Sequence, residues 1–241
     1  MHTNSFNLLI LAGGKATRMG NICEEIPKSL LEINGKTILE RQLDLVKNIH
    51  ISETIIAAHH LASKFEPIAL NRGLSIYVSA SPEGTGGAIY NAMKKFKDKN
   101  LPTIVMNGDI LLAENLTIMA NNWSYYISDV MIMGTKVNSV ADFGSLNISM
   151  MSEEVGEVKQ FVEKTGIDSP GYINAGIYII LTSNYLHFEE ERNKTGNWSV
   201  ERDTFPAMIE RKYVVDTYLT EAEWIDCGTP ERLQRAKEIF K

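Results

Sequence analysis

The stretch that most restricts what this chain can fold into is an apolar run, residues 8–12, that breaks into two consecutive glycines. Such a run is typical of a buried strand entering a loop, and glycines let the loop backbone come close to a ligand. Lys15, Thr17 and Arg18 follow in the loop, and Lys28 adds a third cation. Backbone amides and cations together neutralise a polyphosphate, so the stretch predicts a phosphate-binding loop. A tight turn with solvated charges is the alternative on these residues alone.

Several classes of phosphate-binding protein are excluded by pattern and charge. The sequence contains neither the G-x-x-x-x-G-K-[ST] run of a P-loop nor the G-x-G-x-x-G dinucleotide fingerprint. With 24 Lys and Arg against 30 Asp and Glu, the net charge of −6 argues against a general partner role for nucleic acid or an anionic membrane. A protein of this charge that handles polyphosphates must concentrate its cations locally, as the opening stretch does.

The cysteine content and the lengths of the apolar runs indicate the cellular compartment in which the protein is expected. Cys23 and Cys227 are the only two cysteines, so neither a disulfide framework nor a zinc-type cysteine cluster is available. The opening apolar run is too short for the core of a signal peptide, and no apolar run approaches the roughly 20 residues of a membrane span. We therefore expect a cytoplasmic protein.

Short apolar runs separated by helical spacers predict an α/β fold with a parallel sheet. In the first half the expected strands are residues 8–12, 54–58, 75–78 and 103–106. A helix with capping-box spacing is expected to begin at Thr37, with Glu40 as the reciprocal partner. The second half is richer in strands, which are expected at residues 129–137, 146–150, 157–163 and 172–181.

Three further segments are expected in the C-terminal part. Residues 189–197 are polar and charged, which predicts a mobile loop, and a short helical stretch is expected over 199–206. Thr229 suits the N-cap and Pro230 the first position of a final helix.

A second glycine-rich loop and a strand-end carboxylate are the next candidate site features. Residues 81–87 open directly into a helix with an apolar stripe, and a glycine loop at a helix N-terminus offers amides to an anion or a base edge. Asp109 follows a buried strand, where open α/β sheets bind ligands. Helix capping is the ordinary role of such a residue, but the upstream loops favour metal binding. His59 and His60 would point to opposite faces of a strand, so an ordinary loop role is favoured for both.

Six motifs in order resemble those of the sugar-1-phosphate nucleotidyltransferases. They are L-A-G-G-x-A-T-R-M from Leu11, at the end of the apolar run that starts at Leu8, P-K-S-L at Lys28, G-T-G-G-A at Gly84, G-D at Asp109, F-x-E-K at Lys164 and I-D-x-G-T-P at Asp226. The resemblance runs from Leu8 to Pro230, nearly the whole chain. It implies the nucleotide-diphospho-sugar transferase fold, a Rossmann-like three-layer sandwich with a mainly parallel central sheet. It also implies one domain over 1–241, with a nucleotide-binding half (1–110) and a sugar-binding half (111–241).

The resemblance also implies a set of site residues. Arg18, Lys28 and Lys164 would be catalytic, and Asp109 and Asp226 would hold Mg²⁺. The nucleotide would be bound by Leu11, Ala12, Gly13, Gly14, Thr17, Glu83, Gly84, Thr85 and Asn107. The sugar would be bound by Gly144, Glu163 and Asn174. Ala16 departs from the pattern, because most members have glycine there, and it requires a loop conformation that tolerates a Cβ.

The implied reaction transfers a nucleoside monophosphate from an NTP to a sugar 1-phosphate. The S-x-E-x-D run at 199–203, with the motifs above, is most similar to D-glycero-α-D-manno-heptose 1-phosphate guanylyltransferases, so GTP is the favoured nucleotide. Mannose 1-phosphate guanylyltransferases, N-acetylmuramate 1-phosphate uridylyltransferases and cytidylyltransferases are alternatives. So is a non-catalytic nucleotide-sugar binding subunit, although such a protein would be expected to have lost some of the charged positions. A homo-oligomer is left open.

Overall fold

The computed structural model describes residues 5–141, 143–162, 166 and 168–241. Its strands are β1 (Ser5–Ala12), β2 (Glu32–Ile33), β3 (Lys36–Thr37), β4 (His50–Ala58), β5 (Ser75–Val78), β6 (Thr103–Asn107), β7 (Ile110–Leu112), β8 (Val130–Val137), β9 (Ser145–Met150), β10 (Val155–Val162), β11 (Gly171–Ile180), β12 (Val215–Thr220) and β13 (Trp224–Asp226). Its α-helices are α1 (Ile38–Leu45), α2 (Glu66–Arg72), α3 (Gly84–Met93), α4 (Thr117–Tyr126), α5 (Thr182–Arg192), α6 (Phe205–Glu210) and α7 (Pro230–Ile239). Shorter helical turns are η1 (Thr17–Cys23), η2 (Lys28–Leu30), η3 (Ala62–Phe65) and the π-turn η4 (Val200–Thr204).

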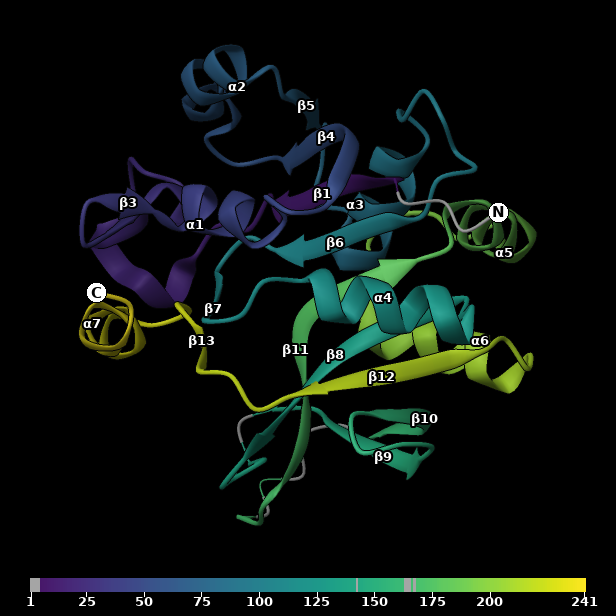
Figure 1. Cartoon of the computed structure of the whole chain (residues 1–241). Helices are drawn as coiled ribbons and strands as arrows, with labels where there is room; N and C mark the ends of the chain where they lie inside the picture. The colour runs from purple at the N-terminus through teal and green to yellow at the C-terminus, as the bar shows by residue number, and fades with distance from the viewer. Residues whose placement is uncertain (1–4, 142, 163–165, 167) are drawn as a thin grey trace.

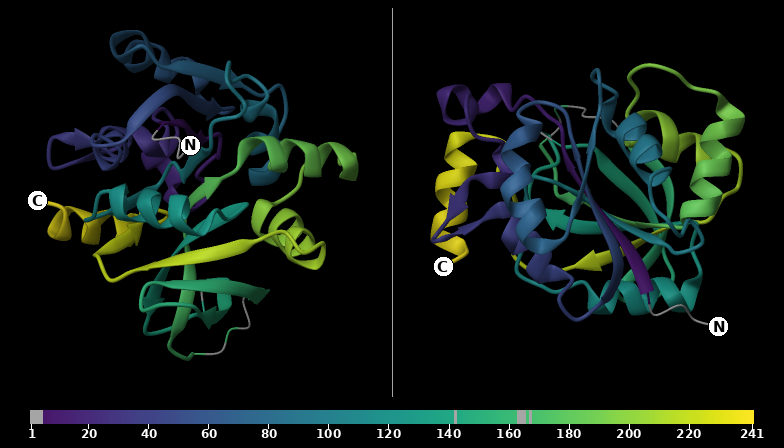
Figure 2. Two further views of the ribbon diagram at one scale, coloured as in Figure 1. Left: turned by 45° about the vertical axis from the view of Figure 1, so that its right-hand side comes forward. Right: turned by 90° about the horizontal axis from the view of Figure 1, so that it is seen from above.

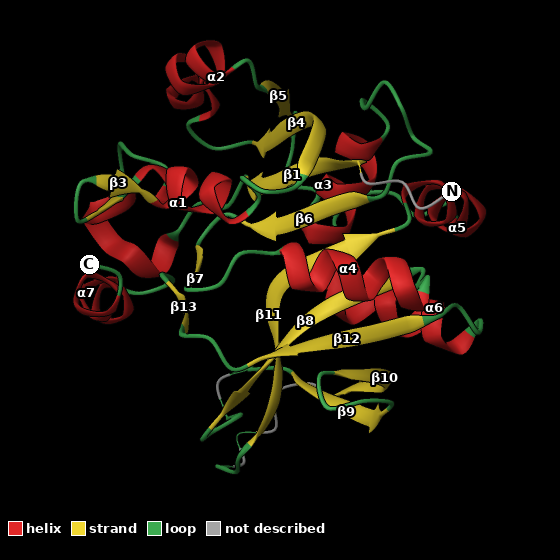
Figure 3. Cartoon of the chain, in the orientation of Figure 1, coloured by secondary structure: helices red, strands yellow, loops and turns green. Residues whose placement is uncertain are grey.

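One nine-stranded sheet runs through the molecule in the order β5-β4-β1-β6-β11-β8-β12-β10-β9 (Figures 1 and 3). The four strands β5, β4, β1 and β6 are parallel to one another. Parallel neighbours need crossover connections, which run over the faces of the sheet. Strand β11 is antiparallel to β6 and β8, β12 is parallel to β8, and β10 and β9 form an antiparallel hairpin at the far edge. The predicted α/β fold is confirmed, with the parallel part concentrated in the first half.

Helices cover both faces of the sheet, which gives three layers. Along β1, Leu8 and Ile10 face one core cluster while Leu9 faces the other, as the two-residue period of a strand requires. The first cluster packs against α1 and α4, and the second against α3, α5 and α6. Figure 2 (right) shows the two groups of helices on opposite sides of the sheet. Within the described residues no helix is long and apolar enough to cross a membrane.

The predicted mobile loop at 189–197 is partly wrong. Helix α5 continues to Arg192, and Glu189 is only 3% exposed. Its carboxylate accepts hydrogen bonds from Arg192 (2.8 Å) and from the Thr204 hydroxyl (2.6 Å). The polar composition of the segment predicts a solvated loop, but its first residue, Glu189, is buried with partners that the local sequence does not reveal.

The carboxyl ends of β5, β4, β1 and β6 meet at one edge of the sheet, because these strands are parallel. Their following loops therefore gather residues that are far apart in the sequence. At a corresponding edge, open α/β sheets bind their ligands.

Candidate active site

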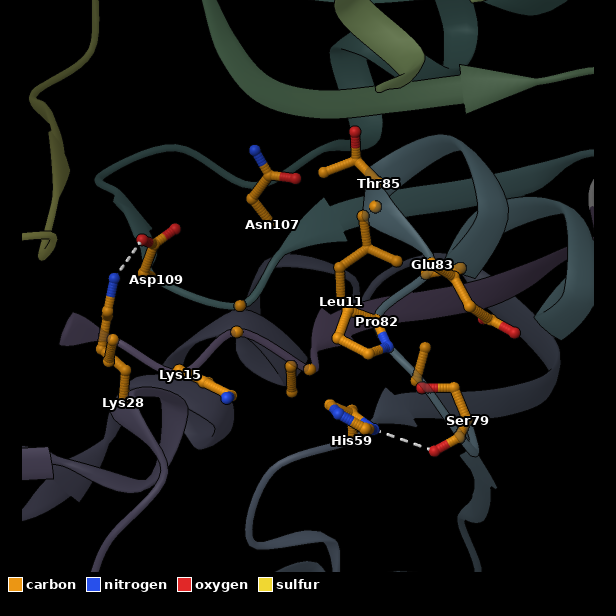
Figure 4. A pocket seen from close by; sticks show the side chains of 18 of the residues that line it. Leu11, Lys15, Lys28, His59, Ser79, Pro82, Glu83, Thr85, Asn107 and Asp109 are labelled. Atoms are coloured by element: carbon orange, nitrogen blue, oxygen red, sulfur yellow. Dashed lines mark hydrogen bonds and ion pairs between the residues drawn. The ribbon is translucent and has the colours of Figure 1, made fainter. Parts of the chain in front are cut away.

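A pocket of about 470 Å³ lies at this edge of the sheet. It is lined by residues 11–16, 28–29, 57, 59, 79, 82–85, 88, 107–109 and 197. Figure 4 shows Lys28 and Asp109 at one end and His59, Ser79 and Glu83 at the other, with Leu11 between them. The pocket thus has one end formed by a lysine and an aspartate, and an opposite end that combines imidazole, hydroxyl and carboxylate groups.

The phosphate loop is joined directly to the turn that follows β6. The Gly108 amide donates a hydrogen bond to the Leu11 carbonyl at 2.8 Å. A Cβ on Gly108 would lie 2.5 Å from that same oxygen, so only glycine allows the two backbones to come this close. The contact fixes Asp109 relative to the start of the loop.

Lys28 and Asp109 form an ion pair at the charged end. Lys28 Nζ lies 2.8 Å from Asp109 Oδ2, and the two side chains are 17% and 26% exposed. Gln42, which is buried on α1, donates to the carbonyl groups of Asn107 (2.7 Å) and Ile110 (3.1 Å) and so holds the turn that carries Asp109. Gln42 was not among the predicted site residues, and no local pattern distinguishes it.

Asp226 lies beside Asp109 because β13 pairs with β7 and the Cys227 amide donates to the Asp109 carbonyl at 2.8 Å. Burial, followed by the charges of the nearby Asp109 and Asp226 carboxylates, raises the pKa of the Cys227 thiol to about 12. This thiol therefore stays protonated at neutral pH, as expected for a buried small side chain.

Two arginines flank Asp226. Arg232 forms an ion pair with Asp226 Oδ2, and Oδ1 accepts a hydrogen bond from the Gly228 amide. Arg18, on η1, has an exposed side chain whose Nη2 would lie 3.1 Å from a Cβ on Gly228. The same Cβ would lie 2.7 Å from Asp226 Oδ1, so the Arg18 guanidinium and the Asp226 carboxylate both lie against Gly228.

The paired carboxylates fit a divalent cation that is shared with a phosphate ligand. The described residues contain no group of three or more His, Cys, Asp or Glu side chains able to hold a metal by themselves. Mg²⁺, however, is bound in many phosphate-handling sites by only one or two carboxylates together with substrate phosphates. Asp109 and Asp226, which the backbone pairing of β7 and β13 brings close together, are the carboxylates that would supply this oxygen donor set.

Residues 84–87 of the predicted second glycine-rich loop form the first turn of α3, and this turn is shaped by Trp198, a contact that the sequence did not reveal. The Gly86 amide donates to the Trp198 carbonyl, and the Trp198 amide donates to the Glu83 carbonyl, both at 3.0 Å. A Cβ on Gly86 would lie 2.3 Å from Trp198 Cδ1. The glycine was expected to expose its amide to a ligand, but this amide is used within the protein. Asn197, next to Trp198, lines the pocket.

Glu83 is held by the protein at the end of the pocket away from Lys28. Its carboxylate accepts hydrogen bonds from Tyr77 Oη (2.9 and 3.1 Å) and Asn91 Nδ2 (3.0 Å). Burial, followed by the hydrogen bond and charge of Glu83, raises the pKa of Tyr77 to about 12. The Tyr77 hydroxyl thus remains a donor to Glu83 at neutral pH.

Most of the predicted nucleotide-side residues come together in the pocket. These are Leu11, Ala12, Gly13, Gly14, Lys28, Glu83, Gly84, Thr85, Asn107 and Asp109. Thr17 and Arg18 lie on η1 with exposed side chains, outside the lining. Gly144 and Asn174 lie near each other, since Ser145 pairs with Ile173 between β9 and β11, but neither lines this pocket. Glu163 and Lys164 lie outside the described residues.

His59 lines the pocket, although the sequence favoured an ordinary loop role for it. Its Nδ1 is 2.9 Å from the Ser79 carbonyl, which can only accept, so Nδ1 carries the proton in this contact. Ser29, Ser79 and Pro82 are further lining residues that the sequence did not single out. Only their place in the sequence could have indicated them, because Ser79 and Pro82 follow the end of β5 and Ser29 follows Pro27 and Lys28.

Ala16 adopts the left-handed conformation with φ of 51° and ψ of 36°. A Cβ is unfavourable there, so Ala16→Gly is expected to raise the free energy of unfolding by about 1 kcal/mol. Chemical denaturation of both proteins measures the difference. An equal or lower free energy of unfolding in the variant would show that the loop relaxes to another conformation.

Comparisons with curated proteins return guanylyltransferases. The chain is 29% identical over 232 residues to a probable mannose-1-phosphate guanylyltransferase of Arabidopsis thaliana, covering 92% of this chain and 61% of the relative. It is 28% identical over 241 residues to mannose-1-phosphate guanylyltransferase of Mycobacterium tuberculosis, covering 98% and 64%. The chain thus spans a little over three-fifths of the length of these relatives.

Solved structures give the same fold over the whole chain. HddC from Yersinia pseudotuberculosis superimposes with a TM-score of 0.79 at 29% identity, covering 98% of this chain and all of that one. Its complex with GMP-PN gives a TM-score of 0.77. UDP-glucose pyrophosphorylase, at 21% identity and a TM-score of 0.80, supports the fold alone.

Fold and pocket together define an α/β protein in which a glycine-rich loop, Lys28 and Asp109 meet at the carboxyl edge of the parallel strands. The family model for nucleotidyl transferases matches residues 7–240. The chain belongs to this nucleotidyl transferase family.

Proposed function

We propose that the chain transfers a nucleoside monophosphate from an NTP to a sugar 1-phosphate and releases pyrophosphate. The observation that carries the proposal is the Lys28–Asp109 ion pair at the charged end of a glycine-lined pocket, with Asp226 alongside. The names of the curated relatives and the GMP-PN complex of HddC favour GTP as the nucleotide. D-glycero-α-D-manno-heptose 1-phosphate is our first choice of sugar, and mannose 1-phosphate is the alternative.

In the proposed reaction an oxygen of the sugar phosphate attacks the α-phosphorus of the NTP. One P–O bond forms there, the bond from the α-phosphorus to the bridging oxygen of the β-phosphate breaks, and pyrophosphate leaves with the electron pair. Two anions must meet, so the protein has to neutralise and align them more than it has to move protons. Lys28, Arg18 and the amides of the phosphate loop would neutralise the triphosphate. Lys164 would hold the attacking phosphate.

Mg²⁺ is the cation we propose for the carboxylate pair, and when bound it neutralises charge on the phosphates during transfer. Asp109 and Asp226 would hold it. Lys28 keeps the Asp109 carboxylate in one orientation, since its ammonium contacts one of the two carboxylate oxygens. Arg232 does the same for Asp226.

The sugar would be bound in the second half of the chain. We place it against Gly144, Glu163 and Asn174, with residues 1–110 binding the nucleotide and 111–241 the sugar within one domain over 1–241. An enzyme of this kind would act in the cytoplasm and supply nucleotide sugars for cell-surface polysaccharide.

The proposal is tested by pyrophosphate release from each of the common NTPs against a panel of sugar 1-phosphates, with Mg²⁺ and with excess EDTA. We expect the fastest release with GTP and the heptose or mannose 1-phosphate, and loss of activity in EDTA. If no pair of substrates releases pyrophosphate while the protein still binds a nucleotide sugar, the protein is a non-catalytic nucleotide-sugar binding subunit and not an enzyme.

A further inference from the structure

The segment 199–203 places a carboxylate, Glu201, between the two halves of the site. Ser199 caps η4 by accepting a hydrogen bond from the Arg202 amide (3.2 Å), and Asp203 accepts one from the Ser199 amide (2.8 Å). Asp203 is also paired with Lys194 at 2.6 Å. These contacts fix the turn, so that Glu201 is half-buried and faces the protein.

Three hydroxyl groups hold the Glu201 carboxylate. Oε2 accepts hydrogen bonds from Thr85 Oγ1 (2.8 Å) and Ser199 Oγ (2.7 Å), and Oε1 accepts one from Tyr178 Oη (3.2 Å). Among the described residues no ion pair within 4.0 Å involves Glu201. Three hydrogen bonds from hydroxyl groups on different elements thus fix the position of the Glu201 carboxylate.

On the nucleotide side, Glu201 fixes the first turn of α3. The Thr85 hydroxyl donates to Glu201 and accepts from the Val200 amide at 2.9 Å. Both functions of this hydroxyl are thus used within the protein, and Thr85 faces the pocket as an immobilised residue. Helix α3, which begins at Gly84, packs directly against η4.

On the sugar side, Glu201 fixes strand β11. Tyr178 donates to Glu201 and accepts from Asn174 Nδ2 at 2.8 Å, and Asn174 Oδ1 accepts from the Gly176 amide at 2.9 Å. Tyr178 is fully buried, and burial together with Glu201 raises its pKa well above the usual value, so its hydroxyl stays a donor. A continuous chain of hydrogen bonds therefore joins Thr85 to Asn174 through Glu201.

We propose that Glu201 is a positioning residue that couples the nucleotide subsite to the sugar 1-phosphate subsite. This rests on the proposed function for the identity of the two ligands. The hydrogen bonds from Thr85 to Asn174 form one connected arrangement, so a ligand that favours this arrangement at one subsite also favours it at the other, which produces positive cooperativity. Glu201 acts through Thr85 and Tyr178 and need not touch either substrate.

The test is the thermodynamic coupling between the two ligands, measured by calorimetry without turnover. The dissociation constant of α,β-methylene GTP, which cannot be cleaved at the α-phosphorus, is measured alone and with saturating mannose or heptose 1-phosphate. In the wild-type protein the sugar phosphate should tighten nucleotide binding about fivefold or more, and the reciprocal titration should give the same factor. In Glu201→Ala the factor should fall to less than about twofold, with the affinity for the nucleotide alone changed much less.

Two further variants separate coupling from folding. Glu201→Gln leaves one oxygen for three hydroxyl donors, so its coupling should lie between those of the wild type and the alanine variant, and it decides the question if the alanine variant does not fold. Glu190→Ala removes an exposed carboxylate from α5 and should keep wild-type coupling. Wild-type coupling in both Glu201 variants, or none in the wild-type protein, overturns the proposal. Absence of turnover would contradict the proposed function but leave this binding measurement intact.

Discussion

Replacing Lys28 with alanine is expected to lower kcat about a hundredfold or more, since one preorganised electrostatic partner of the transition state is lost. Lys28 contacts Asp109 at 2.8 Å and lines the pocket, so its charge would be felt by both the carboxylate and the triphosphate. Asp109→Asn should have an effect of the same size, because it removes the negative charge that pairs with Lys28 and that is proposed to bind Mg²⁺. Steady-state pyrophosphate release, with the best substrate pair, gives both values.

A matched control is available in the exposed pair of Lys36 and Asp44. Its Nζ–Oδ2 distance is also 2.8 Å, but its side chains are 57% and 50% exposed and lie outside the pocket. Lys36→Ala should therefore keep kcat, and exposed pairs of this kind contribute little to stability. Near-wild-type turnover in Lys28→Ala, with the variant folded, would remove Lys28 from the mechanism.

Gly108→Ala should strongly disrupt the site, because the added methyl group would meet backbone atoms at the end of β1. The new Cβ would lie 2.5 Å from the Leu11 carbonyl oxygen, and neither backbone can move without breaking the hydrogen bond between Gly108 and Leu11. We expect the free energy of unfolding to fall by about 3 kcal/mol, and the phosphate loop to separate from the Asp109 turn. Chemical denaturation measures the first effect, and the dissociation constant for GTP the second.

Gly14→Ala is the control for this variant. Gly14 is in the same pocket, but nothing lies within 4 Å of a Cβ added there. Its free energy of unfolding should change by less than about 0.5 kcal/mol. If Gly108→Ala were as stable as Gly14→Ala, the close approach of the two strand ends would be absent from the protein in solution.

The local elements could be predicted because each depends on neighbouring residues. The apolar runs of β1, β4 and β6 are buried on both faces, as expected for inner parallel strands, whereas β5 at the edge of the sheet is only partly buried. Thr37 caps α1 with both bonds of a capping box, since the Glu40 amide donates to Thr37 Oγ1 and the Thr37 amide donates to Glu40. The first phosphate loop and Asp109 could be brought together because both follow parallel strands.

Contacts between distant segments could not be predicted in the same way. Asp226 reaches Asp109 only because two three-residue strands, β7 and β13, pair although more than a hundred residues of sequence separate them. Trp198 packs against Gly86 and leaves no room there for a Cβ, and these two residues are also far apart in the sequence. The sequence predicted that Gly86 contributes to a binding loop but did not reveal that Trp198 contacts it. Side-chain partners of this range are specified by the tertiary fold and leave no periodic signal.

The central claim is that an oxygen of the sugar phosphate attacks the α-phosphorus of the NTP. It is tested most directly by supplying the sugar 1-phosphate with ¹⁸O in every non-bridging phosphate oxygen and locating the label by mass spectrometry. We predict that all of the label is found in the NDP-sugar and none in pyrophosphate. An NDP-sugar without label, together with labelled inorganic phosphate, would show that the sugar C–O bond had broken instead and would contradict the account.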